Sequence, residues 1–202
     1  MKNIVKGKLG TIFTIGGFKK DIFFGIQWIK KPHGLKKCGF FTVFKRPMRI
    51  LNRKYIEIGN NCYIMDGIRI EAIDIWNNKK IVPFPQMIIE DNVSIGQNCH
   101  FTTANKIVIG RGTSILPDVL ITDIKHKSEK NRSIMDTDIV IGSVEIGNYV
   151  QVGMGARIMA NGKDIKIGNN AIIGANAVVT KDVPEGVTVV GIPAVELRRK
   201  EQ

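Results

Sequence analysis

An aliphatic residue recurs at every sixth position through the C-terminal part of the chain. A glycine often follows it, and a small or β-branched residue stands four places after it. The aliphatic positions are Ile146, Val152, Ile158 and, after a short insertion, Ile167, Ile173 and Val179. Neither a helix nor a hairpin has this period. A buried aliphatic residue at every sixth position is typical of a parallel β-helix, in which three hexads make one coil.

The same pattern continues towards the N-terminus. Triplets of hexads begin at Ile89 and Ile109, and a weaker triplet begins at Ile58. The repeat region then holds about fifteen hexads, which predicts an all-β fold, a parallel β-helix of about five coils.

We expect the chain to divide into three parts. Residues 1–54 form a basic N-terminal extension or cap, residues 55–190 form the β-helix, and residues 191–202 form a C-terminal tail. Residues 41–57 read as extended chain and are expected to make an irregular first coil. The tail is expected to contain a short, charged helix over residues 195–200.

The hexad count breaks at four places, and each break follows the third hexad of a triplet. The breaks come after Ile70, Phe101, Ile121 and Ile158. All insertions therefore leave the β-helix at the same corner. Because coils stack about 4.8 Å apart, the insertions lie side by side along one edge. Loops that a rigid scaffold positions often carry function, and the longest one, at about residues 123–145, contains His126.

The positive charge is concentrated in the first quarter of the chain. Residues 1–54 contain 14 Lys or Arg and one acid, Asp21, while the whole chain has a net charge of +12. The candidate partners are an anionic membrane surface, an acidic substrate or lipid-diphosphate carrier, and nucleic acid. No nucleic-acid-binding motif accompanies the charge, so we expect no nucleic-acid partner.

The apolar residues of segment 1–40 do not predict a membrane-spanning helix. Lys19, Lys20 and Asp21 interrupt them well short of the ~20 residues that such a helix needs, and no secretory cleavage site follows. These residues are expected either to cap the open end of the β-helix or to lie on a membrane. We expect a cytoplasmic protein, with peripheral contact at the inner face of the membrane through residues 1–54.

Neither the cysteines nor the histidines have the spacing of a metal site. Cys62 and Cys99 stand at the small fifth position of a hexad and are expected to be buried thiols in a reducing compartment. The repeat region contains two histidines, His100 and His126, so the three-histidine zinc site of a β-helix carbonic anhydrase cannot form. We expect no metal, and we expect His100 at a turn.

Two further stretches accompany the hexads. They are the tail segment VVTKDVPEGVTVVGIPAVELRR at residues 178–199 and the histidine loop PDVLITDIKH at residues 117–126. Over residues 55–199 the chain thereby resembles the hexapeptide-repeat acyltransferases, particularly sugar O-acetyltransferases similar to galactoside and maltose acetyltransferase. The resemblance implies a left-handed parallel β-helix, a homotrimer, and acetyl-CoA bound between neighbouring subunits. Crossovers between parallel strands are generally right-handed, so the repeat by itself does not predict a left-handed β-helix. The left hand is what the resemblance to the family implies.

By this resemblance His126 is the catalytic residue, since it follows Pro117 at the distance of the family's catalytic histidine. Acyl transfer from a thioester to a hydroxyl needs a base whose pKa is near the working pH, which suits imidazole. Many relatives carry two histidines as D-H-x-H, whereas this chain reads DIKH and keeps the second. Asp123 and Asn105 are the candidate acceptor-binding residues.

The resemblance also implies contacts with coenzyme A. The matching positions are Ala175, Thr180, Lys181 and Arg198. Arg198 corresponds to a basic position near the nucleotide phosphates. Two positions depart from the family pattern: Met154 replaces a small polar residue at a coenzyme-contacting turn, and Val195 stands where some members carry a further arginine.

We therefore predict an acetyl-CoA-dependent O-acetyltransferase that acts on a sugar hydroxyl in capsule, exopolysaccharide or lipopolysaccharide biosynthesis. The alternatives on the same scaffold are a serine acetyltransferase and an acetyltransferase of amino sugars or xenobiotics. The long helical N-terminal domain and the D-H-A-T-G motif of serine acetyltransferases are missing from this sequence. An inert β-helix scaffold or binding protein is the alternative of another class, and the placement of His126 argues against it.

Overall fold

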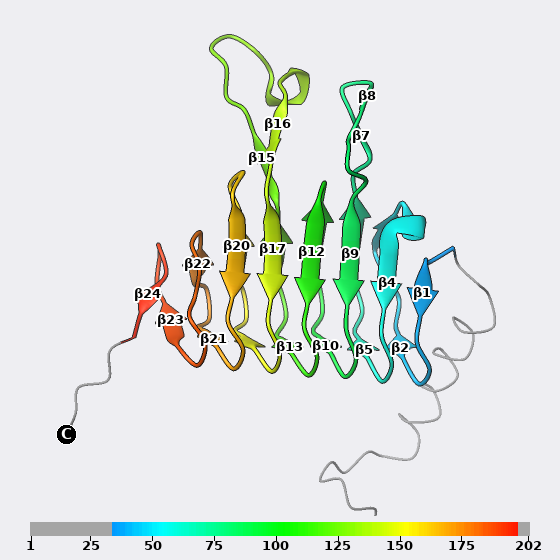
Figure 1. Ribbon diagram of the computed structural model, residues 1–202, viewed down its shortest axis with the longest axis vertical. Helices are drawn as coiled ribbons and strands as arrows, with labels where there is room; N and C mark the ends of the chain where they lie inside the picture. Colours follow the sequence, from blue (N-terminus) through cyan, green and yellow to red (C-terminus); the bar gives the residue numbers. More distant parts are fainter. Residues whose placement is uncertain (1–33, 198–202) are drawn as a thin grey trace, which may run out of the picture.

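The computed structural model describes residues 34–197, and these residues form a parallel β-helix with three sheets (Figure 1). Sheet A contains β1 (Lys37–Cys38), β4 (Ile56–Ile58), β9 (Gln86–Ile89), β12 (Lys106–Ile109), β17 (Ser143–Ile146) and β20 (Asp164–Ile167). Sheet B contains β2 (Val43–Phe44), β5 (Tyr63–Ile64), β10 (Ser94–Ile95), β13 (Ser114–Ile115), β18 (Gln151–Val152), β21 (Ile172–Ile173), β23 (Thr188–Val190) and β24 (Val195–Glu196). Sheet C contains β3 (Arg49–Leu51), β6 (Arg69–Ala72), β11 (His100–Thr103), β14 (Leu120–Thr122), β19 (Arg157–Met159) and β22 (Val178–Val179).

Two antiparallel hairpins project from the coils. The first consists of β7 (Ile75–Trp76) and β8 (Lys79–Lys80), and the second consists of β15 (Ile124–His126) and β16 (Ile139–Ile141). Two short 3-10 helices complete the described elements, η1 (Arg53–Tyr55) and η2 (Ile134–Asp136). None of the helices within residues 34–197 is long and apolar enough to cross a membrane.

The aliphatic hexad positions form the core, as the sequence predicted. In sheet A, the Cα partners on successive coils are Ile58, Ile89, Ile109, Ile146 and Ile167. Each of these side chains is at most 2% exposed, and burying one contributes about 1.5–3 kcal/mol. The core is thus a stack of aliphatic layers along the axis. The thiols of Cys62 and Cys99 are buried within it, as predicted.

The described residues form six complete coils, the five that the repeat count indicated and the irregular first coil that we expected at residues 41–57. This first coil runs from β1 to β3, so it begins at Lys37, earlier than expected, and lies within the segment 1–54. Its strands pair with the second coil in the same parallel register as the later coils. The hexads of this coil are difficult to recognise in the sequence because Pro47 and charged residues interrupt them.

The helix that we expected over residues 195–200 is not found within its described part. Val195 and Glu196 form β24, which pairs antiparallel with β23 at the end of sheet B. The sequence suggested a helix because it is charged and lacks the hexad period, but the preceding turn at residues 191–194 returns the chain to the edge strand. Residues 198–200 lie outside the described residues.

All four insertions leave from one corner, as their phase predicted. Each connects a strand of sheet C to the next strand of sheet A, at residues 73–85, 104–105, 123–142 and 160–163. The two hairpins rise from this edge on either side of the short connection at residues 104–105 (Figure 1). The β-helix therefore holds the predicted functional loop next to its neighbours on a single edge.

Candidate active site

His126 is the last residue of β15, in the hairpin that the longest insertion forms. Its Cα partner in the antiparallel ladder is Ile139 of β16. The side chain is half-buried. The hairpin projects from the corner between sheets C and A (Figure 1), and His126 does not belong to the buried core cluster.

The imidazole of His126 packs against the indole of Trp76, which belongs to the first hairpin. The two ring centroids are 4.9 Å apart and the ring planes meet at 59°. Nδ1 of His126 is buried and has no hydrogen-bond partner among the described residues. Nε2 is then the ring nitrogen left to exchange a proton with a substrate. Trp76 was not among the residues predicted from the sequence, although an aromatic residue in a predicted corner loop was an available signal.

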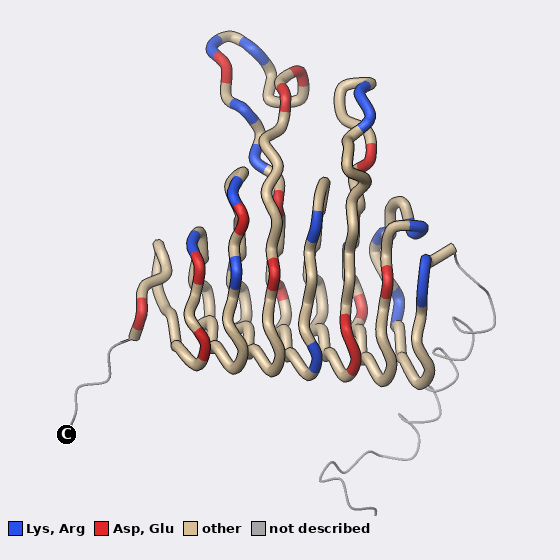
Figure 2. The backbone as a smooth tube through the Cα atoms, in the orientation of Figure 1, with Lys and Arg blue, Asp and Glu red and all other residues tan. Residues whose placement is uncertain are grey.

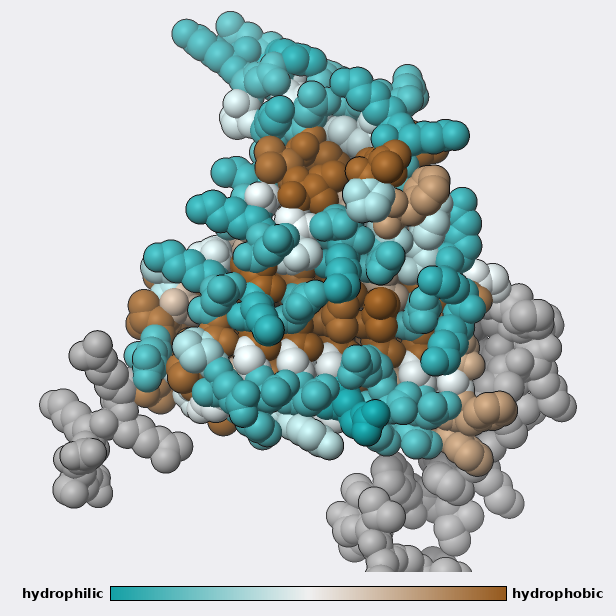
Figure 3. Space-filling model, viewed as in Figure 1, coloured by the Kyte–Doolittle hydropathy of each residue, from teal (hydrophilic) through white to brown (hydrophobic). Residues whose placement is uncertain are grey.

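Hydrogen bonds to Thr137 fasten the two hairpins together. Nε1 of Trp76 donates to the carbonyl oxygen of Thr137 at 2.8 Å, and Nδ2 of Asn77 donates to the same oxygen at 3.0 Å. The hydroxyl of Thr137, a buried residue, donates to the carbonyl oxygen of Lys127 at 2.6 Å. Apolar side chains also gather over the strands of the two hairpins (Figure 3). The hairpins thus contact each other directly.

Asp123 is the first residue of the His126 insertion and anchors its base. Its side chain is fully buried, and its carboxylate accepts hydrogen bonds from the Thr103 hydroxyl at 2.5 Å and from the backbone N–H groups of Ala104, Asn105 and Lys106 at 2.8, 3.0 and 2.9 Å. Burial raises the pKa of Asp123, and these hydrogen bonds oppose the rise. A carboxylate without solvent access is not placed to contact an acceptor, so the structure argues against that expected role.

Asn105 lies between the two hairpins. It belongs to the short connection from β11 to β12, one coil after the hairpin of Trp76 and one coil before the hairpin of His126. Nδ2 of Asn105 donates to the carbonyl oxygen of Gly142 at 3.0 Å, and the side chain is half-buried. This position is compatible with the expected acceptor contact, which stays a prediction.

The expected coenzyme-binding residues lie at two different corners. Thr180 and Lys181 follow β22 at the corner from which the hairpins leave, and Lys181 is exposed. This corner is two coils beyond that of His126, or about 10 Å along the axis. Ala175 is exposed in the turn between β21 and β22, at the corner of sheets B and C. Arg198 lies outside the described residues.

His100 is a strand residue and not the turn residue that we expected. It begins β11 with its side chain on the outer face of sheet C, because the neighbouring Phe101 points inward. Nε2 of His100 lies 2.9 Å from Oγ1 of Thr102 and 3.3 Å from Oε2 of Glu71. Burial raises the pKa of Glu71, but hydrogen bonds from Arg69 and His100 bring it below the ordinary value. His100 is therefore engaged in an ionic cluster away from the hairpins.

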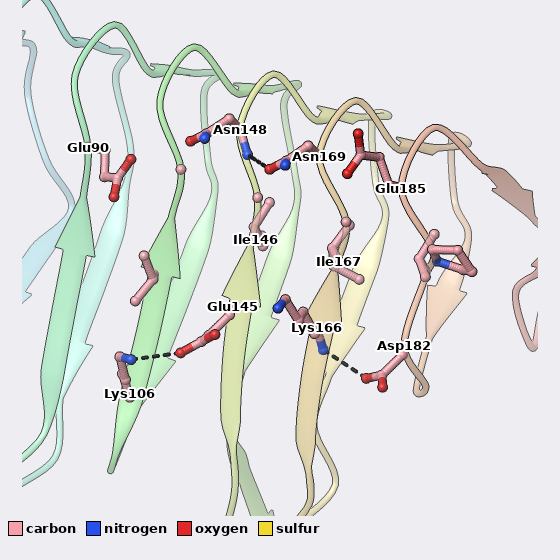
Figure 4. A pocket seen from close by; sticks show the side chains of 16 residues that line it. Glu90, Lys106, Glu145, Ile146, Asn148, Lys166, Ile167, Asn169, Asp182 and Glu185 are labelled. Atoms are coloured by element: carbon pink, nitrogen blue, oxygen red, sulfur yellow. Dashed lines mark hydrogen bonds and ion pairs between the residues drawn. The ribbon is translucent and has the colours of Figure 1, made fainter.

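A shallow depression of about 570 Å³ lies on the outer face of sheet A (Figure 4). Its charged lining residues are Glu90, Lys106, Glu145, Lys166, Asp182 and Glu185. Nζ of Lys106 lies 2.7 Å from Oε1 of Glu145, and the backbone N–H of Lys166 donates to Oδ1 of Asp182 at 2.8 Å. His126 does not line the depression, so the catalytic chemistry is not assigned to it. Across residues 34–197, no group of three or more His, Cys, Asp or Glu is placed to hold a metal ion.

Comparison with known proteins identifies relatives of the whole β-helix. No family model matches the chain. Over 190 residues it is 28% identical to a protein of Escherichia coli strain K12 that is named as a lipopolysaccharide biosynthesis O-acetyl transferase, covering 82% of this chain and 90% of that protein. It is 31% identical over 118 residues to the galactoside O-acetyltransferase of the same strain, covering 53% of this chain and 54% of that enzyme. The chain thus spans about half the length of this second relative.

A solved structure shares the fold over most of both chains. It is AntD, an N-acyltransferase from Bacillus cereus in complex with dTDP and 3-hydroxybutyryl-CoA, with a TM-score of 0.70 at 18% identity, covering 87% of this chain and 88% of that one. The fold is accordingly the left-handed parallel β-helix of acyltransferases. Its hexads and its O-acetyltransferase relatives make the chain similar to the hexapeptide-repeat acyltransferases, in agreement with the resemblance noted in the sequence.

Proposed function

We propose that the protein transfers an acetyl group from acetyl-CoA to a sugar hydroxyl. Nε2 of His126 takes the proton of the hydroxyl as its oxygen attacks the thioester carbonyl carbon. The tetrahedral intermediate then expels the coenzyme A thiolate, which receives the proton from the imidazolium. The supporting observation is the position of His126 on the loop edge, with its ring packed against Trp76 and Nδ1 buried.

The proposed acceptor is a sugar in capsule, exopolysaccharide or lipopolysaccharide assembly. The support is the relative from Escherichia coli that is named for lipopolysaccharide biosynthesis and that matches most of this chain. An amino-sugar acceptor is a second candidate, because AntD, which shares the fold, is an N-acyltransferase. An acetyl-transfer screen that follows free coenzyme A thiol, with sugars, sugar nucleotides and lipid-linked oligosaccharides as acceptors, tests the proposal. Transfer to amines alone would contradict an O-acetyltransferase.

We propose that coenzyme A contacts Ala175, Thr180 and Lys181, together with Arg198 in the tail. The complex of AntD with 3-hydroxybutyryl-CoA supports a coenzyme A thioester as the donor on this fold. Lys181 is exposed on the same edge as His126, and an ammonium group there is suited to a phosphate of the coenzyme. Acetyl-CoA would act as a co-substrate, and the proposed chemistry requires no metal.

Lys181→Ala is expected to raise the Michaelis constant for acetyl-CoA more than it lowers turnover. Loss of a contact that is equal in the ground state and the transition state has this kinetic pattern. The matched control is Lys163→Ala, which removes an exposed lysine from the same edge one coil earlier. Steady-state kinetics with varied acetyl-CoA measure both constants. A large fall in turnover at an unchanged Michaelis constant would contradict the assignment.

We propose a homotrimer in the cytoplasm, with the coenzyme site between neighbouring subunits. The support is the resemblance to the hexapeptide-repeat acyltransferases, and light scattering after size-exclusion chromatography tests the trimer. We also propose that the basic segment 1–54 contacts an anionic membrane surface. Within residues 34–54 its cations lie along the first coil (Figure 2).

Flotation of the full chain with anionic vesicles is expected at low salt and is expected to be lost at high salt. Exposed charges are screened over about 8–10 Å at physiological ionic strength, so contact through segment 1–54 should weaken as salt is added. Removal of residues 1–33, which leaves the first described coil intact, should also abolish flotation. Equal recovery with neutral and anionic vesicles at both salt concentrations would refute the membrane contact.

A further inference from the structure

We propose that Trp76 is a positioning residue for the catalytic imidazole, and that hairpin β7–β8 holds the hairpin of His126 in place. The inference deepens the proposed function and rests on the role of His126 as the base. Its observations are the contacts between the two hairpins, which belong to insertions two coils apart.

The hairpin of His126 needs support from outside itself. β15 and β16 are three residues each and pair only with each other within the described chain. An isolated two-stranded hairpin is marginally stable in water. A catalytic base, however, must be held close to its productive geometry, since a displacement of about 1 Å can reduce the rate 100-fold. The required rigidity must therefore come from a neighbouring element.

Trp76 contacts the His126 hairpin on both sides of its long loop. Its indole ring packs on His126, where the loop begins, and its Nε1 donates to the carbonyl oxygen of Thr137, where the loop ends. Nδ2 of Asn77 adds a second hydrogen bond to the same oxygen. The hairpins can meet because the coil between them leaves the corner through a connection of two residues, 104–105. One side chain thus fixes both ends of the loop.

Packing against the indole also sets the orientation of the imidazole ring, in place of a hydrogen bond to Nδ1. In many active sites a hydrogen bond to one ring nitrogen sets the orientation and the tautomer of a histidine. Nδ1 of His126 lacks such a partner in the described part of the chain. The nearest aspartate along the sequence before it, Asp123, is fully buried and accepts hydrogen bonds from residues 103–106. Ring packing against Trp76 is therefore the contact that defines which way Nε2 points.

Trp76→Ala is expected to lower turnover about 10- to 100-fold while leaving the Michaelis constant for acetyl-CoA unchanged. Trp76→Phe keeps an aromatic face against His126 and should retain turnover within about threefold of wild type. The matched control is Ile75→Ala, which removes an exposed side chain from the same strand, β7, and it should stay within about twofold. If the Trp76→Ala variant does not fold, the same measurements are made on Trp76→Leu. Leucine restores apolar volume without an aromatic face.

A second measurement separates this inference from the proposed function. The ring-proton NMR resonances of His126, assigned by their loss in His126→Ala, should shift or broaden in Trp76→Ala and stay in place in Ile75→Ala. Should His126→Ala remain active while these shifts occur, the proposed base is wrong and the positioning contact stands. Turnover of Trp76→Ala within twofold of wild type, or equal damage by Trp76→Phe and Trp76→Ala, would overturn the positioning role.

Discussion

His126→Ala is expected to reduce turnover by about 10²–10⁴-fold, the usual range for loss of a general base. Thermal stability, oligomer size and affinity for acetyl-CoA should stay close to wild type. The imidazole lies outside the stacked core, and the hairpin keeps the hydrogen bond from Trp76 to Thr137 without it. Steady-state kinetics against the acceptor, thermal unfolding, size-exclusion chromatography and equilibrium binding of acetyl-CoA measure turnover, stability, oligomer size and affinity, respectively.

The matched control is Lys125→Ala. Lys125 precedes His126 in β15 and is exposed, and its side chain points to the opposite face of the strand because side chains alternate. Its loss should change turnover by less than about threefold. If His126→Ala kept more than about a tenth of wild-type turnover, another group would have to act as the base.

The position of the edge from which the insertions leave could be predicted because the hexad period reports burial directly. Each break after Ile70, Phe101, Ile121 or Ile158 occurs where an inward residue ends a coil, so the corner follows from counting alone. The contact between Trp76 and His126 could not be predicted in this way. It depends on how two hairpins bend towards each other above a short connection, and the repeat does not encode that conformation.

The burial of Asp123 was present in the sequence but was not recognised. Residues alternate inward and outward along a strand, so Asp123 takes the next inward position after Ile121. The same alternation buries Thr103 after Phe101 and Ala72 after Ile70. Asp123 was expected to bind the acceptor, whereas strand phase indicates a structural carboxylate. Strand phase is the better guide here, because the alternation of inward and outward side chains in sheet C continues past the last aliphatic position of the hexads.

Asp123→Ala is expected to be strongly destabilising, by about 3–5 kcal/mol, in contrast to His126→Ala. It removes the acceptor of four donors: the Thr103 hydroxyl and the N–H groups of Ala104, Asn105 and Lys106. Each buried donor left without a partner costs about 1–3 kcal/mol. Loss of these bonds should also free the base of the hairpin that carries His126, so activity should fall together with stability.

Asp123→Asn tests whether the hydrogen bonds or the size of the side chain matters. The amide has nearly the same volume and keeps one oxygen for the N–H of Ala104, but its NH₂ group would face donors that now share Oδ2 of Asp123. We expect a loss of about 2–3 kcal/mol. The control Asp138→Ala removes an exposed carboxylate from the same insertion and should cost less than about 0.5 kcal/mol. Denaturant midpoints at equal protein concentration measure the stability of all three variants. A midpoint equal to wild type for Asp123→Ala would show that these hydrogen bonds do not hold the corner together.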